Sequence, residues 1–239
     1  MTADTRERRD FASEIKFLVD PATGVRIREW ARAQLERDPY GVGPDGDQYL
    51  TSTLYFDTAT FDVVRRTGSY GRAKYRVRRY DGEAKVFLER KLRRAALLCK
   101  RRTLVPLDAL ARITDPAAGW EGAWFARRIS ARQLAPVCQI SYQRTARVAA
   151  HDTGRIRLTL DESIRAAPRQ QLSFAEPSGT LVAPNHVVLE LKYHAALPAV
   201  FKQLVEEFKL QPQRVSKYRL AAEALGFATP VRAANGTYA

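Results

Sequence analysis

The sequence predicts an α+β protein that is mainly antiparallel β, with eight or more strands in a barrel or sandwich and helices on its outside. The first observation is that short segments of alternating apolar and polar residues recur along the chain, as expected for strands with one buried face. The second is the turn pair Asp81-Gly82, which joins two such segments into a hairpin. The third is that helical spacing of apolar residues is confined to a few segments.

In the first half of the chain, a strand is expected at residues 11–19. A helix should follow from Pro21 to Asp38, because apolar residues recur there at roughly helical spacing. A loop rich in Gly, Pro and Asp then leads into an antiparallel meander. Its strands are expected at 48–57, 61–66, 71–80, 84–93 and 97–105.

The second half opens with helices at 106–114 and 120–133, which are separated by the helix-breaking pair Asp115-Pro116 and are expected to cover the sheet. Residues 166–185 are rich in Pro and form either a long loop or a weak hairpin. The remaining strands are expected at 137–148, 155–165 and 186–193, and the remaining helices after Pro198 and at 215–225. We expect one domain, residues 1–239, with its core at about 11–226 and flexible tails at 1–10 and 229–239.

The composition indicates an anionic partner. The chain has 40 Lys and Arg against 26 Asp and Glu, a formal net charge of +14. Such an excess suits phosphates, nucleic acid or an acidic membrane surface. An RNP-type aromatic strand, a zinc finger and a clear recognition helix are all missing from the sequence, so no nucleic-acid partner is predicted. No stretch approaches the roughly 18 apolar residues of a transmembrane segment, and the two cysteines fit a reducing environment, so a cytoplasmic location is expected.

A Glu and a Lys stand two residues apart in three of the predicted strands. The three pairs are Glu14 with Lys16, Glu89 with Lys91, and Glu190 with Lys192. Side chains on a strand alternate between faces, so each Glu shares a face with its Lys while the large apolar neighbours face the other way. One such pair is typical of a solvated strand. Three pairs indicate a polar lumen that handles anions.

The strand at 71–80 is the most informative, because Arg72, Lys74, Arg76 and Arg78 all fall on one of its faces. Like charges two residues apart repel, so this face requires carboxylates or bound anions opposite it. Arg binds phosphate oxygens in a bidentate manner and Lys acts as a compact charge, which favours a ligand with several phosphates. Carboxylates in the same lumen would pair with the cations or hold a divalent metal that bridges phosphates, and Glu190 is the first candidate.

Eight short motifs run in order along about residues 11–225: Glu14-Ile15-Lys16-Phe17, Ser52-Thr53-Leu54-Tyr55-Phe56-Asp57-Thr58, Lys74-Tyr75-Arg76-Val77-Arg78, Phe87-Leu88-Glu89-Arg90-Lys91, Tyr142-Gln143-Arg144, Arg157-Leu158-Thr159-Leu160-Asp161, Leu189-Glu190-Leu191-Lys192-Tyr193 and Ser216-Lys217-Tyr218. Together they resemble the motif set of the vacuolar transporter chaperone catalytic domain. Its bacterial relatives are described as polyphosphate polymerase domain proteins. The family belongs to the triphosphate tunnel metalloenzymes, in which basic residues and metal-binding carboxylates point into an antiparallel β-tunnel. The resemblance and the alternation together predict a closed eight-stranded β-tunnel with helices covering the outside.

The resemblance implies a metal-dependent polyphosphate polymerase, an ATP:polyphosphate phosphotransferase that transfers the γ-phosphate of ATP to a growing polyphosphate chain inside a basic tunnel. Resemblance and strand alternation together give three groups of candidate residues. The catalytic candidates are Arg76, Arg78, Lys91, Arg144 and Arg157. The phosphate-binding candidates are Lys16, Lys74, Lys100, Lys192, Arg214 and Lys217. The candidate ligands for Mn²⁺ or Mg²⁺ are Glu190, Glu14, Glu89 and Asp161.

Two alternatives remain open at this point. One is a hydrolase of short polyphosphate or triphosphate, in which water replaces the acceptor. The other is a module that binds polyphosphate or inositol phosphate without turnover. The superfamily branch with cyclase and thiamine triphosphatase activity carries Glu-x-Glu-x-Lys near its start, whereas this chain has Ala12 at the first acidic position. That difference favours the polymerase-type branch, which also lacks the first Glu.

Overall fold

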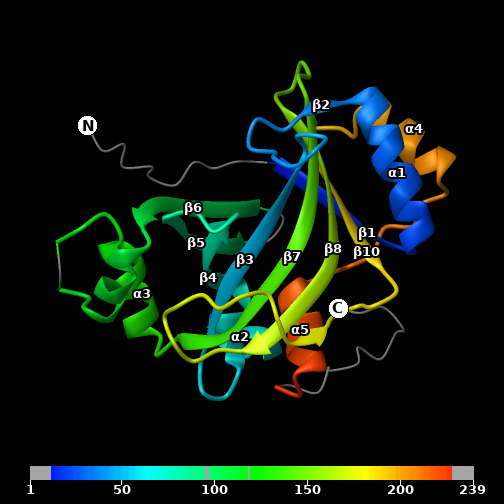
Figure 1. Cartoon of the computed structure of the whole chain (residues 1–239). Coiled ribbons are helices and arrows are strands. Elements are labelled where there is room, and N and C mark those ends of the chain that lie inside the picture. Colours follow the sequence, from blue (N-terminus) through cyan, green and yellow to red (C-terminus); the bar gives the residue numbers. More distant parts are fainter. Residues whose placement is uncertain (1–11, 95–96, 118, 228–239) are drawn as a thin grey trace.

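The computed structural model describes residues 12–94, 97–117 and 119–227 (Figure 1). The strands are β1 (Ala12–Val19), β2 (Glu36–Arg37), β3 (Gln48–Asp57), β4 (Ala73–Tyr80), β5 (Lys85–Arg94), β6 (Leu97–Pro106), β7 (Ala135–Ala149), β8 (Ile156–Pro168), β9 (Thr180–Leu181) and β10 (Val187–His194). The helices are α1 (Pro21–Gln34), α2 (Asp62–Arg65), α3 (Ala123–Ala131), α4 (Ala199–Glu207) and α5 (Lys217–Ala224), with 3₁₀ turns η1 (Gly68–Arg72) and η2 (Asp108–Thr114).

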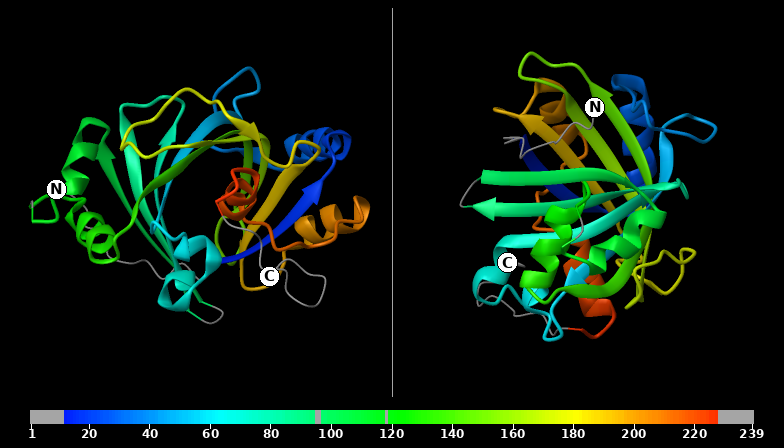
Figure 2. Two further views of the ribbon diagram at one scale, coloured as in Figure 1. Left: turned by 90° about the horizontal axis from the view of Figure 1, so that it is seen from below. Right: turned by 90° about the vertical axis from the view of Figure 1, so that its left-hand side faces the viewer.

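Eight of the strands form one antiparallel path in the order β1-β10-β8-β7-β3-β4-β5-β6, while the short strands β2 and β9 pair with β7 and β8. The sheet is strongly curled, and its two ends, β1 and β6, are not paired with each other in the described part of the chain (Figure 2). Register shifts occur in β7 between Ser141 and Gln143 and in β3 between Tyr55 and Phe56. Such irregularities bend a strand and increase its twist, which helps the sheet curl. The mainly antiparallel α+β prediction is confirmed.

Two separate apolar clusters cover the convex side of the sheet. Near β1, β10 and β8, side chains such as Phe17 and Leu189 pack against α1 and α4 through Ile27 and Phe201. Over β3, β4 and β5, the outward side chains pack against α3, whose Phe125 is fully buried and meets the ring of Phe56 edge to face. The predicted outer cover by helices is therefore confirmed. No helix in the described residues is both long and apolar enough to cross a membrane.

Helix α5 lies on the concave side of the sheet, inside the curl (Figures 1 and 2). Its Tyr218 is buried, stacks on Tyr55 with ring centroids 4.7 Å apart, and donates a 2.5 Å hydrogen bond to the carboxylate of Asp57. Asp57 is 1% exposed and also accepts from the backbone N–H groups of Val63 and Val64. One buried carboxylate thus joins β3, α2 and α5.

The strand predicted at 61–66 is wrong. Residues Asp62–Arg65 form α2 instead, between Phe61 and Arg66, which both have left-handed backbone torsions. The Asp57 carboxylate accepts hydrogen bonds from N–H groups at the start of this turn, so the segment forms a helical turn where the sequence predicts a strand. Two smaller differences follow. The predicted helix 106–114 contains the 3₁₀ turn η2, and in the predicted loop or weak hairpin 166–185, β8 continues to Pro168 and Thr180–Leu181 pairs with it as β9. The predicted tails, 1–10 and 229–239, lie outside the described residues.

The Asp57–Tyr218 contact predicts a measurable stability loss in Tyr218→Phe, because Asp57 loses a buried donor while the ring stays in place. We expect a cost of about 1–2 kcal/mol in the free energy of unfolding, measured by urea denaturation. Tyr70→Phe is the matched control, since the Tyr70 hydroxyl makes only a 3.4 Å contact with the carbonyl of Arg132 and should cost less than about 0.5 kcal/mol. Equal losses in the two variants would contradict this role for Asp57.

Candidate phosphate-binding site

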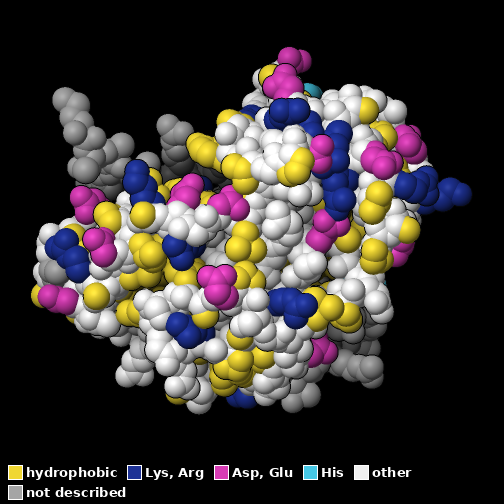
Figure 3. Space-filling view, viewed as in Figure 1, with side chains coloured by type: hydrophobic (Ala, Val, Ile, Leu, Met, Phe, Trp, Pro, Cys, Tyr) yellow, Lys and Arg dark blue, Asp and Glu magenta, His cyan; other side chains and the backbone are white. Residues whose placement is uncertain are grey.

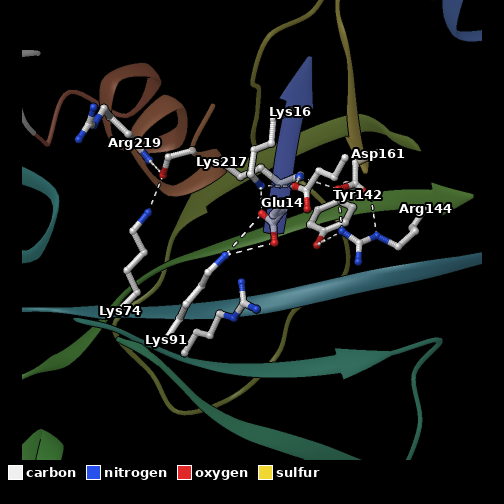
Figure 4. A network of polar contacts seen from close by, with 12 residues as sticks. Glu14, Lys16, Lys74, Lys91, Tyr142, Arg144, Asp161, Lys217 and Arg219 are labelled. Carbon is white, nitrogen blue, oxygen red and sulfur yellow. Dashed lines mark hydrogen bonds and ion pairs between the residues drawn. The ribbon is translucent and has the colours of Figure 1, made fainter. Parts of the chain in front are cut away.

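The concave face of the sheet carries most of the predicted cations, and Figure 4 shows Lys16, Lys91, Arg144 and Lys217 around Glu14 and Asp161. Glu89 and Glu190 lie among the same group of cations. Directly opposite residues on neighbouring antiparallel strands share a face, and the register brings Lys74 opposite Lys91 and Arg76 opposite Glu89. It likewise pairs Lys91 with Lys100 and Lys16 with Glu190. The single-face alternation predicted for these strands is therefore present in three dimensions.

The first ion-pair group joins β1, β10 and α5. Lys16 Nζ lies 2.7 Å from Glu14 Oε1 and 2.6 Å from Glu190 Oε1, and Lys217 Nζ lies 2.7 Å from the same Glu190 oxygen. Lys91, on β5, reaches Glu14 at 3.4 Å. This last contact connects β1, at one end of the curled sheet, with β5, next to the other end, although the backbones of these strands are not paired.

The second group is centred on Asp161, which is completely buried. Arg144 donates to both of its oxygens, at 2.6 Å from Nε and 2.7 Å from Nη2, which is the bidentate geometry that a guanidinium also forms with phosphate. Lys217 Nζ completes the set at 2.5 Å. Because Lys217 contacts both Asp161 and Glu190, α5 links the first two groups.

The third group surrounds Glu89, which is 1% exposed. Arg76 Nε lies 2.6 Å from one of its oxygens, and Lys100 Nζ and Arg102 Nε lie 2.8 Å and 3.1 Å from the other. Three cations, one from β4 and two from β6, thus share one carboxylate. The register places Arg76 and Arg102 directly opposite Glu89, and Lys100 lies two residues from Arg102 on the same face of β6.

Electrostatics keeps all four carboxylates ionised. Burial opposes ionisation of Glu14, but Lys16 and Lys91 outweigh it and lower its pKa to about 2. For Glu89 and Glu190, burial is likewise outweighed by the surrounding cations, which lower the pKa well below the usual value. For Asp161, Arg144 and Lys217 overcome burial and lower the pKa. The cations outnumber these carboxylates, so the concave face keeps a net positive charge.

The excess charge is most evident at the end of the face next to α5. Lys74 Nζ donates a 2.7 Å hydrogen bond to Ser216 Oγ, the residue that caps the N-terminus of α5. Burial and the neighbouring charges of Lys91 and Lys16 lower the pKa of Lys74 to about 7. Lys74 thus has a neutral hydroxyl, and no carboxylate, as its hydrogen-bond partner.

The other predicted cations occupy varied positions. Arg78 is buried and donates to Thr53 Oγ1 at 3.2 Å. Arg157 contacts the Tyr49 hydroxyl at 2.5 Å and Asp38 at 3.1 Å, and Lys192 pairs in register with Glu14. Arg214 is exposed in the segment before α5, outside the ion-pair network that the described residues form.

Sequence reasoning did not single out Arg102 or Tyr80. The two adjacent arginines of β6 face opposite sides of the sheet, because Arg101 stacks on Trp124 outside and Arg102 pairs with Glu89 inside. Lys100 and Arg102 are two residues apart on one strand and therefore share a face, so the alternation that predicted Lys100 also predicts an inward Arg102. Tyr80 lies opposite Thr51 on the concave face, where its hydroxyl accepts from Arg102 at 3.1 Å.

One outer face of the molecule lacks a continuous basic area among its described residues, which agrees with the location of many Lys and Arg side chains on the concave face. On the face seen in Figure 3, blue and magenta side chains are interspersed with one another and with apolar ones. Large basic fields that steer polyanions to an outer surface would gather as one blue area.

A strongly curled antiparallel sheet whose concave face carries Lys, Arg and carboxylates is the arrangement of the triphosphate tunnel proteins. The family model of the VTC domain matches residues 11–225, and the chain belongs to this family. The resemblance inferred from the motifs is therefore confirmed.

Two solved structures agree on the fold. A protein from Bacillus halodurans, named as a candidate adenylate cyclase, superposes with a TM-score of 0.54 at 17% sequence identity, over 85% of this chain and 92% of that one. A protein from Pyrococcus horikoshii OT3 superposes with a TM-score of 0.51 at 13% identity, over 89% of this chain and 98% of that one. At these identities the likeness concerns the fold alone. A search of curated protein sequences finds no significant match to this chain.

The low pKa of Lys74 predicts that binding of a polyanion is coupled to proton uptake. At pH 8 the amine is mainly neutral in the free protein, and a bound phosphate would raise its pKa and draw a proton from solution. Calorimetric titration of inorganic triphosphate at pH 8, in buffers of different ionisation enthalpy, should show proton uptake that decreases in Lys74→Met. Lys85→Met, at an exposed position at the start of β5, is the control and should leave the uptake unchanged. Uptake that is the same in all three proteins would contradict the assignment.

Proposed function

We propose that this protein is a metal-dependent polyphosphate polymerase, which transfers the γ-phosphate of ATP to a growing polyphosphate chain along the concave face. The observation that carries the proposal is the convergence of Lys16, Arg76, Lys91, Lys100, Arg144 and Lys217 from separate elements around Glu14, Glu89, Asp161 and Glu190. Membership of the VTC family supports it. ATP and polyphosphate or triphosphate are the proposed partners.

Phosphate binding would proceed by exchange of ion pairs. Each cation is already oriented toward the concave side by a carboxylate, so an entering phosphate oxygen replaces that carboxylate without a large rearrangement. Arg76 and Arg144 offer guanidinium edges for bidentate contacts, and the lysines add charges that need no fixed angle. This site therefore favours a chain of phosphates over a single small anion.

A divalent metal fits part of this site. No group of three His, Cys, Asp or Glu side chains in the described ranges is placed to hold a metal ion. Magnesium, however, commonly binds through one or two carboxylates plus phosphate oxygens of its substrate. Glu190 and Glu14 would provide such a pair, since Lys16 contacts both and their side chains are 17% and 22% exposed. Asp161 and Glu89 are 0% and 1% exposed among their cations and serve better as counter-ions.

When bound, Mn²⁺ or Mg²⁺ would supply charge neutralisation on the phosphates. The chain's own residues would do the remaining work. Phosphoryl transfer passes through a loose transition state, so positioning and electrostatic stabilisation provide most of the rate enhancement. Arg76, Arg78, Lys91, Arg144 and Arg157 are the proposed catalytic cations. An acceptor phosphate is already anionic at neutral pH, which removes the need for a general base.

We also propose that the curled sheet functions as a closed tunnel. The contact between Lys91 on β5 and Glu14 on β1 supports closure by side chains where backbone pairing is missing. Phosphates bound between these strands would add further bridges from one end of the sheet to the other. Closure would exclude water, and this favours transfer to a phosphate acceptor over hydrolysis.

The proposal predicts that the purified chain makes polyphosphate from ATP with Mn²⁺ or Mg²⁺, measured by staining of gels for long chains. Arg76→Ala should lower the rate about 100-fold or more, because it removes a cation aimed at the reacting phosphates. Arg79→Ala is the matched control, since Arg79 lies three residues after Arg76 on the opposite face of β4 and donates to the carbonyl of Glu83 in the hairpin turn. Its rate should remain within about twofold of wild type.

Other results of this ATP assay would indicate a different function for the protein. Phosphate release without chain growth would replace the polymerase by a hydrolase. Untouched ATP with every metal, combined with tight and salt-dependent triphosphate binding, would leave a binding module. If Arg76→Ala does not fold, Lys91→Ala provides the same test, since the Lys91 side chain is 32% exposed and contributes less to the buried network.

A further inference from the structure

An aromatic patch lies on the concave face where β4 ends, β5 begins and β6 ends, near the hairpin turn between β4 and β5. The register places Phe87 opposite Arg78 on one side and Leu104 on the other, so Phe87 faces the same way as the phosphate-binding cations. The rings of Tyr80 and Phe87 are 5.7 Å apart, and Tyr80 also meets Tyr49 edge to face at 5.4 Å. Leu104 is 46% exposed beside them. None of these groups is needed to bind phosphate.

Arg102 lies across this patch in a fixed position. Its guanidinium carbon is 3.3 Å from the centre of the Phe87 ring and 5.7 Å from that of Tyr80. Its Nη2 donates a hydrogen bond to the Tyr80 hydroxyl at 3.1 Å, and its Nε lies 3.1 Å from Glu89 Oε1 as an ion pair. One face of the guanidinium is thus supported by an aromatic ring while its edges are restrained. The side chain nevertheless keeps 34% of its surface exposed.

We propose that Arg102, Phe87 and Tyr80 form a stacking platform for the base of the bound nucleotide. Nucleobases stack on guanidinium planes and on aromatic rings, and a platform whose position is already fixed loses little conformational freedom on binding. This inference rests on the proposed function, since it assumes that the tunnel takes a nucleoside triphosphate. It adds a site for the nucleoside to a tunnel whose other residues recognise only phosphate.

The position of the platform also gives the nucleotide a direction. Lys100 and Arg102 are two residues apart on β6, a step of about 6.6–6.8 Å along the strand, and both contact the same oxygen of Glu89. A base on Arg102 therefore places its phosphates beside Lys100 and Arg76. The chain of phosphates then points toward Lys74 and the N-terminus of α5, where the acceptor would lie.

The test compares ATP with inorganic triphosphate, which has the phosphates but no base. Binding is measured by calorimetry at low salt in the presence of a chelator, so that no turnover occurs. Arg102→Lys keeps the charge and the reach to Glu89 but removes the planar group. We expect it to weaken ATP binding about tenfold and to leave triphosphate binding within about twofold. Phe87→Leu, which removes the support of the guanidinium, should show the same difference.

Arg101→Lys is the matched control, because Arg101 is the preceding residue on the same strand and its guanidinium stacks on Trp124 on the convex side, 4.3 Å from the ring centre. It should change neither affinity. Equal weakening of ATP and triphosphate by Arg102→Lys would overturn the platform and make Arg102 one more phosphate ligand. Unchanged affinity for both ligands in Arg102→Lys and Phe87→Leu would also overturn it while the proposed function stands. A wild-type protein that binds neither ligand would refute the proposed function, and the platform with it.

Discussion

The structure depends on the pairing of buried carboxylates with an excess of cations inside a curled sheet. Side chains on one face of a strand project in the same direction, so the charges of Lys74, Arg76 and Arg78 lie close together. Their repulsion is stronger than in water because the effective dielectric constant is lower inside the curled sheet. Glu89 resolves this at the centre, where Arg76, Lys100 and Arg102 share it. Removing such a partner from a buried ion pair typically costs about 3–5 kcal/mol, so each carboxylate is structurally important in the absence of ligand.

The same pairing would prepare the face for the polyanion that we propose as its ligand. A cation that is already desolvated and oriented toward the lumen loses little further hydration or side-chain freedom when it binds a ligand. An entering phosphate would replace a carboxylate, which has a similar charge and similar acceptor oxygens. The apolar packing of α1, α3 and α4 on the convex side supports this arrangement, because it stabilises the sheet from the outside and leaves most of the inner face to charged residues. Helix α5 is the exception. It enters the concave side, where Tyr218 is anchored on Asp57 and Lys217 reaches two of the carboxylates.

The sequence predicted the strands and the direction of their charged side chains because both depend on a period of two, which is a local property. It therefore placed Lys16, Lys91 and Glu190 on the charged faces of their strands without any knowledge of strand order. It could not predict α2, because that turn is specified by the Asp57 carboxylate from outside the segment and by Tyr218 from a distant helix. The sequence also could not predict which carboxylates suit a metal and which suit the role of counter-ion. Glu14 and Asp161 differ in the cations that surround them, which local sequence does not specify. Arg102 was missed because a run of basic residues conceals which ones face inward.

The central claim is that phosphate oxygens replace the carboxylates as partners of the inner cations. A crystal structure with inorganic triphosphate and Mn²⁺ would test this exchange most directly. This claim predicts phosphate oxygens within hydrogen-bonding distance of Arg76, Lys91 and Arg144, and metal density at Glu190 with a further oxygen from the ligand. The cations should move little from their ligand-free positions while their distances to Glu89, Glu14 and Asp161 lengthen. Triphosphate bound on the convex surface, with the inner ion pairs intact, would contradict the account.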